Sequence, residues 1–118
     1  FQPDAFRDAF LSQPIPRLTG RTETNPDALR ARLAEVRSLG LSESRGTFQA
    51  EVHSMAVPLF DALGRCMGAV AVAALAMRMT EPQRRLIRFA LTQAGTEITT
   101  LWGGTLPSDI ATLWRLAA

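Results

Sequence analysis

The chain has no lysine, no tyrosine, one cysteine and one histidine among its 118 residues. All 13 of its cationic side chains are therefore arginine, whose charge is not titrated away in proteins. The formal net charge of +2 is too small to indicate a nucleic-acid surface by itself. The single Cys66 excludes an internal disulfide and a cysteine zinc site, and one histidine argues against any metal site made by the protein alone. This cysteine usage favours a reducing, cytoplasmic compartment.

Long apolar runs and catalytic motifs are also missing. The longest apolar stretch, residues 66–77, is too short for a membrane helix, which needs about 20 residues. No P-loop, GxGxxG, GxSxG or paired-carboxylate arrangement occurs, so we expect neither an enzyme nor a cofactor. The chain begins with Phe1 rather than methionine, and we expect it to be part of a longer protein.

A composition of 47% hydrophobic and 20% charged residues predicts a folded domain, and start and stop signals divide it into elements. Asn25 and Gly40 bracket an expected helix, and Thr80 with Gln83 forms a capping box before a long one. The expected helices are 3–12, 26–39, 81–102 and 107–116, the expected strands are 52–60 and 66–74, and residues 41–50 hold at most one short strand. This order predicts an α+β fold with an antiparallel sheet.

The two strands form the clearest hairpin in the chain. A four-residue loop at 61–64, with Asp first and Gly last, would place Phe60 opposite Arg65. Because strand side chains alternate between faces, one face then carries small residues and the other carries bulky ones. In this register Ser54 pairs with Ala71, Ala56 with Ala69 and Val52 with Ala73.

A face of small side chains leaves volume above it that could hold a ligand, with Ser54 as the hydroxyl that fixes a polar group. The alternative is that a helix packs against these residues, with Phe6 or Leu29 filling the space. A hairpin alone makes a poor sheet, so either further strands precede Phe1 or a partner chain completes the sheet.

Other candidate residues favour structural roles. His53 lies on the bulky face opposite Val72 and has no nearby catalytic set, and Cys66 begins a buried strand as a packed thiol. Arg84, Arg85 and Arg88 fit a solvated helix face better than an anion or partner site. Residues 42–46 are either a plain polar loop or a cover for a pocket mouth.

The order and spacing of several runs resemble the C-terminal effector-binding domain of IclR-family transcription regulators. The similarity covers roughly residues 10–104. The runs that carry it are 16–19, 25–29, 33–40 and 54–61, followed by Gly64 and 68–72. Ser-Met-Ala-Val-Pro at 54–58, with the helix entry at 77–80, most resembles the branch that regulates aromatic-acid catabolism by the β-ketoadipate route.

This resemblance implies a GAF-like (profilin-like) antiparallel sheet with flanking helices, incomplete on its N-terminal side, whose effector lies on the sheet. The family has a polar or thiol side chain at Ser54, often an acid at Ser44, and often hydroxyls at Ala71 and Ala73. This chain departs at the last three positions and at Glu51, where glycine is usual, so we expect a more apolar effector such as an aromatic acid. The predicted effector-binding residues are Ser54, Ala56, Ala69, Ala71, Ala73 and Ser44.

The domain assignment that follows is a partial effector-binding domain at 1–104 and a C-terminal extension with a short helix at 105–118. DNA would be bound only by a helix-turn-helix domain that this chain lacks, and a small organic acid would shift a homodimer or homotetramer between arrangements. The rival interpretation is a small α+β dimerisation scaffold of the profilin or roadblock type, without a ligand.

Overall fold

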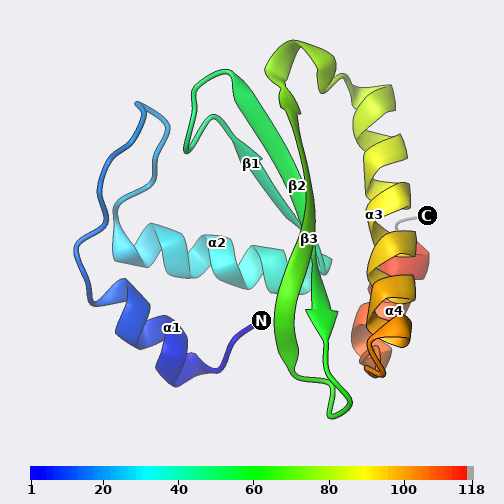
Figure 1. Ribbon diagram of the computed structural model, residues 1–118. Helices are drawn as coiled ribbons and strands as arrows, with labels where there is room; N and C mark the ends of the chain where they lie inside the picture. The colour runs from blue at the N-terminus through cyan, green and yellow to red at the C-terminus, as the bar shows by residue number, and fades with distance from the viewer. Residues whose placement is uncertain (117–118) are drawn as a thin grey trace.

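The computed structural model describes residues 1–116 and contains one antiparallel sheet with helices on both sides. In chain order the elements are α1 (Asp4–Leu11), α2 (Pro26–Leu39), β1 (Ser42–Arg45), β2 (Val52–Phe60), β3 (Cys66–Leu75), a 3-10 turn η1 (Ala76–Arg78), α3 (Glu81–Leu101) and α4 (Ser108–Leu116). The α3 and α4 helices lie on one side of the sheet, and α1 with the first part of α2 lies on the other (Figure 1). The predicted α+β class is confirmed.

The helix boundaries follow local chemistry. The Asn25 side chain accepts hydrogen bonds from the backbone N–H groups of Asp27 and Ala28, at 2.9 and 3.3 Å, and so caps α2. Gly40 ends α2 in the left-handed conformation, with φ of 68°. Thr80 occupies the N-cap position of α3, but its side chain makes no capping hydrogen bond, so the predicted capping box is wrong in its hydrogen bonding.

The sheet has three strands in the order β1-β2-β3. The first strand, β1, lies within the segment for which the sequence allowed one short strand, and it pairs antiparallel with β2. A polar tetrapeptide, Ser-Glu-Ser-Arg, has little intrinsic strand signal, so the long neighbouring strand decides its conformation.

The register of the β2–β3 hairpin differs from the predicted register by two residues. Asp61, rather than Phe60, pairs with Arg65 through a 2.9 Å backbone hydrogen bond, which leaves a three-residue loop with Gly64 at φ of 72°. A bulge between Leu59 and Phe60 adds the second residue of the shift. Because two residues is one full strand period, the side chains before the bulge keep their predicted faces. Phe60, which follows the bulge, does not: it is buried in the core with Met55 and Val57 instead of lying on the small-residue face.

The core lies between the bulky face of the sheet and the two C-terminal helices. Met55 and Val57 of β2 are fully buried there, with Trp114 of α4. Gly95 of α3 permits this contact, because an added Cβ would lie 2.9 Å from both Val57 and the Trp114 ring. A glycine in the middle of a long helix therefore marks the closest approach of three elements.

The outer face of α3 remains open to solvent in residues 1–116. The sequence included Leu86, Phe89 and Leu101 in the apolar face of this helix, yet their side chains are 64%, 51% and 86% exposed. A three-stranded sheet is narrow, and one side of the helix is enough to cover it. The buried side is formed by Leu91, Thr92, Gly95 and Thr99.

Candidate functional site

The predicted effector-binding residues share one face of the sheet, as the sequence analysis expected. We call this set, together with Ser42, the small-residue floor. Ser54 lies directly opposite Ala73 on one side and Ser44 on the other, and Ala56 lies opposite Ala71 and Ser42. The predicted pairing of Ser54 with Ala71 is thus wrong, but the common face is correct because the two-residue shift preserves it.

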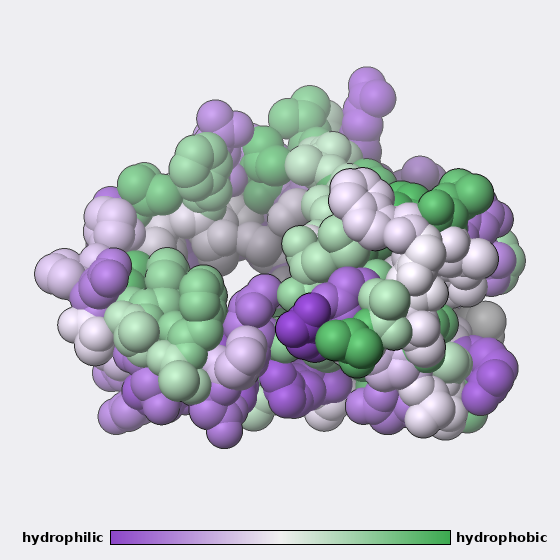
Figure 2. Space-filling view, turned by 60° about the horizontal axis from the view of Figure 1, so that its bottom comes forward, coloured by the Kyte–Doolittle hydropathy of each residue, from purple (hydrophilic) through white to green (hydrophobic). Residues whose placement is uncertain are grey.

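The small-residue floor is open. Its members on β1 and β2, including Ser44, Ser54 and Ala56, are half-buried, whereas Ala69, Ala71 and Ala73 of β3 are exposed. Figure 2 shows the molecule hollowed between the part that contains α1 and the sheet with α3. Phe6, which could have filled this space, is 60% exposed. Residues 1–116 therefore neither seal the floor nor enclose a cavity above it.

A network of hydroxyl groups borders the floor at its β1 end. Ser44 and Thr47 share a hydrogen bond between their hydroxyls at 2.5 Å. The long loop after α1 is attached at the same place, because Thr22 donates to the Thr47 carbonyl and Thr19 donates to the Gly46 carbonyl, both at 2.5 Å. Residues 19–22 and 44–47 thus form one polar wall beside Ser54, where the sequence allowed a cover for the pocket mouth.

An apolar cleft of about 220 Å³ lies at the β3 edge of the sheet, beside the end of α3. Ala69 and residues around the bulge line it together with Ile98, Thr99 and the exposed Trp102, so the cleft belongs to the α3 side of the sheet and not to the space above the floor. Residues 1–116 thus border the floor with hydroxyl groups at β1, whereas its alanines on β3 remain exposed.

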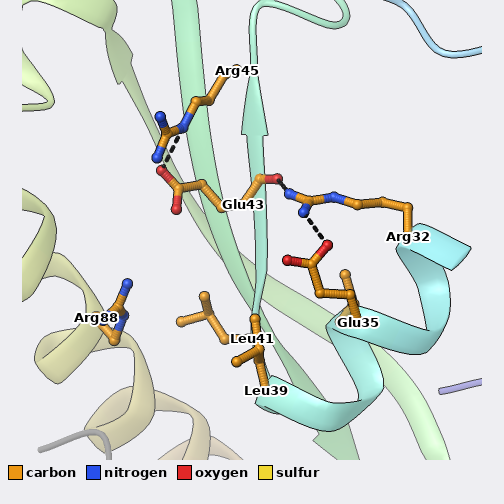
Figure 3. Close-up of a pocket in the computed structure, with 8 residues that line it drawn as sticks. Arg32, Glu35, Leu39, Leu41, Glu43, Arg45 and Arg88 are labelled. Atoms are coloured by element: carbon orange, nitrogen blue, oxygen red, sulfur yellow. Dashed lines mark hydrogen bonds and ion pairs between the residues drawn. The ribbon is translucent and has the colours of Figure 1, made fainter.

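An ion-pair cluster on the other side of β1 was not found from the sequence. Glu43 lies between Arg84 of α3, at 2.6 Å, and Arg45, at 3.1 Å (Figure 3 draws the pair with Arg45). Partial burial works against the ionised form of Glu43, but hydrogen bonds from the two guanidinium groups outweigh it and lower the pKa of the carboxyl. The sequence analysis placed Arg84 on a solvated face. The two residues are 41 positions apart, and no local sequence pattern indicates that they are in contact.

The remaining candidates have structural surroundings. His53 is half-buried on the face that is turned toward α3, opposite Ala74 rather than Val72. Cys66 packs against the core and is partly buried, but the strand that it begins is not buried as predicted, because β3 is an edge strand of half-buried and exposed residues. Within residues 1–116 no group of three potential ligands is placed to hold a metal ion. In the same residues no helix has both the length and the apolar character needed to cross a membrane.

Residues 1–100 match the family described as "Bacterial transcriptional regulator IclR C-terminal", and the chain belongs to that family. Among curated proteins, it is 26% identical over 111 residues to the uncharacterized HTH-type transcriptional regulator RhmR of Escherichia coli (strain K12), a match covering 93% of this chain. The known relatives are transcription regulators rather than enzymes, in agreement with the absence of catalytic motifs.

Solved structures agree with this assignment. A crystal structure described as an IclR-type regulator from Silicibacter sp. TM1040 is 46% identical, with a TM-score of 0.88 over 92% of this chain. The Thermotoga maritima IclR structure shares the fold at 24% identity, with a TM-score of 0.82 over 87% of this chain. The chain spans 43% of the length of RhmR and of the Silicibacter protein, and 42% of the Thermotoga protein.

Proposed function

We propose that the chain is the effector-sensing part of an IclR-type regulator and binds a small organic acid on the small-residue floor. The observation that carries this proposal is the floor itself, a continuous face of serine and alanine side chains with open space above it. Packed sheets usually place bulky side chains on both inner faces, so a floor of this kind provides volume for a ligand.

The effector on this proposal is an aromatic acid. Ser44 of β1 and Ser54 of β2 supply hydroxyls from which a carboxylate could accept hydrogen bonds, and Ala71 and Ala73 of β3 offer an apolar surface on which a ring can lie. The effector would then be a compound of aromatic-acid catabolism, the process controlled by the branch of regulators that the sequence most resembles.

The rest of the pocket and of the sheet comes from segments outside this chain. Strand β3 is an edge of the sheet and has no charged residue along its ten residues. A long, flat, uncharged edge normally has a partner strand, because its free N–H and C=O groups otherwise promote aggregation. A strand added there would border Ala69, Ala71 and Ala73 and give the floor a side wall.

The mechanism is a shift of population between two arrangements of a homodimer or homotetramer. A bound effector changes the arrangement only if it binds one of them more tightly than the other, and the arrangement sets the spacing of the DNA-binding domains elsewhere in the protein. Such a protein acts on DNA in the cytoplasm. We assign the effector-binding unit to residues 1–104, with 105–118 as an extension whose helix α4 packs against the core.

A direct test is the substitution Ser54→Leu in the intact regulator, with titration of benzoate followed by calorimetry. The larger side chain occupies the space above the floor, so benzoate binding is lost while the fold persists. Ser38→Leu, on the exposed side of α2, is the matched control and leaves the affinity unchanged. Equal benzoate affinity in both variants contradicts the proposal and favours a scaffold of the profilin or roadblock type.

A further inference from the structure

A second cavity lies away from the floor, on the other side of β1. It has a volume of about 400 Å³, opens to solvent, and is lined by residues of α2, β1 and α3 (Figure 3). An adjoining recess of about 120 Å³ continues inward and shares Leu39, Leu41 and Arg88 with it. The two volumes together form one site with a charged outer part and an apolar inner end.

The outer part is lined by three arginines and two glutamates, so its side chains carry a net charge of +1. Arg32 donates to Glu35 at 2.6 Å and to the Glu43 carbonyl at 2.6 Å. The Glu43 carboxylate is paired with Arg45 and with Arg84. Arg88 makes no ion pair within residues 1–116, although it is half-buried and lines both cavities. A half-buried cation without a counter-ion provides a site for an anionic ligand.

The inner end of the site determines which apolar group the ligand can have. The recess is lined by the buried Trp114 ring, by the leucines and by Thr92, whose hydroxyl is already bonded to the Phe89 carbonyl at 2.9 Å. The Trp114 indole N–H is likewise engaged, with the Gly40 carbonyl at 2.8 Å. A volume of about 120 Å³ is the size of one small hydrocarbon group, so the recess has room for a short aliphatic chain.

We propose that this site binds a short-chain aliphatic carboxylate, with its carboxylate on Arg88 and its chain in the recess against Trp114. Arg88 reaches the site from α3, and Leu39 at the end of α2 lines both the outer part and the recess. This ligand would be independent of the one on the floor, since Ser54 lies on the opposite face of the sheet from Glu43 and Arg45.

The test compares the binding of hexanoate and of its uncharged analogue hexanamide to the intact protein. Calorimetry gives the affinities, and the indole N–H resonance of Trp114 reports where the ligand lies. We expect hexanoate, but not hexanamide, to shift this resonance, and Arg88→Gln to weaken hexanoate binding at least about tenfold, the loss of one charge-assisted hydrogen bond. Arg85→Gln, at the exposed end of an ion pair with Glu81, is the matched control and leaves binding unchanged.

A second substitution guards against a folding artefact. Leu39 lines both cavities yet is 53% exposed, so Leu39→Phe narrows the recess without disturbing the core, and it too should weaken hexanoate binding. Equal affinity of Arg88→Gln and Arg85→Gln, equal binding of hexanamide, or an unmoved Trp114 resonance each overturns the proposal. Ser54→Leu should leave hexanoate binding unchanged, so the proposal for the floor and the proposal for this site can be refuted independently.

Discussion

Ser44 and Ser54 lie directly opposite each other on β1 and β2, although ten residues separate them in the chain. The Ser44 hydroxyl is bonded to Thr47, so its orientation is fixed by the loop that borders the floor. The Ser54 side chain occupies the centre of the floor, between Ser44 and Ala73. This cross-strand pair is therefore the polar centre of the proposed effector site.

Because α3, α4 and β2 pack closely at Gly95, adding a single methyl group at this position should lower the stability of the fold. Gly95→Ala improves helix propensity, but its Cβ would clash with the buried Val57 and Trp114 side chains. We expect a net destabilisation of about 1–3 kcal/mol in urea denaturation. Gly20→Ala, where nothing lies within 4 Å, should change stability by less than about 0.5 kcal/mol. An unchanged midpoint for Gly95→Ala would mean that the three elements pack less closely than described.

Alanine substitution at the two helix N-cap residues should change the stability of the fold by different amounts. Asn25→Ala removes two side-chain hydrogen bonds to the first turn of α2 and should cost about 1 kcal/mol of stability. Thr80→Ala removes a cap residue whose side chain makes no such bond, so its cost should be under about 0.5 kcal/mol. Thermal denaturation of both variants checks the difference, and equal losses would contradict the capping geometry.

Removal of the Glu43 charge should destabilise the chain at neutral pH. Glu43→Gln leaves Arg84, which is largely buried, without its main counter-ion, and we expect a loss of about 1–3 kcal/mol. Glu81→Gln, at a more exposed position beside the same arginine, is the control and should cost less than about 1 kcal/mol.

The same ion pair has a predictable pH dependence. The pKa of Glu43 is lower in the folded chain than its ordinary value of 4.5, so its contribution to stability is complete above that value. The contribution is lost as the pH falls through the folded-state pKa. The stability difference between wild type and Glu43→Gln should therefore shrink with acidification, and a difference that persists at low pH would rule out this ion pair as its cause.

Local chemistry made the strands and helices predictable. The limits of β2, the cap at Asn25 and the stop at Gly40 all follow from residues next to one another in the sequence. The membership of the floor was also predictable, because strand parity survived a two-residue error in register. That error arose because Asp61 closes the turn through its own backbone and side chain, with its carboxylate accepting from the Leu63 and Arg65 N–H groups at 2.9 Å.

Contacts between distant segments could not be read from the sequence. The Glu43–Arg84 ion pair and the Trp114–Gly40 hydrogen bond join residues 41 and 74 positions apart. Neither has a local pattern, because both depend on how α3 and α4 are placed against the sheet. The cavity at Arg88 is likewise a product of that placement, which is why an arginine-rich helix face was interpreted as solvated.

The most direct test of the proposed sensor function is chemical protection of the floor by the effector. Ala71→Cys in a Cys66→Ser background places a thiol on the floor, and Ala90→Cys places one on the exposed side of α3 as control. With benzoate at ten times its dissociation constant, maleimide labelling at position 71 of the intact protein should slow roughly tenfold, since only unbound protein reacts, while labelling at position 90 is unchanged. Equal labelling rates at position 71 with and without saturating benzoate would contradict the central claim that the effector lies on this face of the sheet.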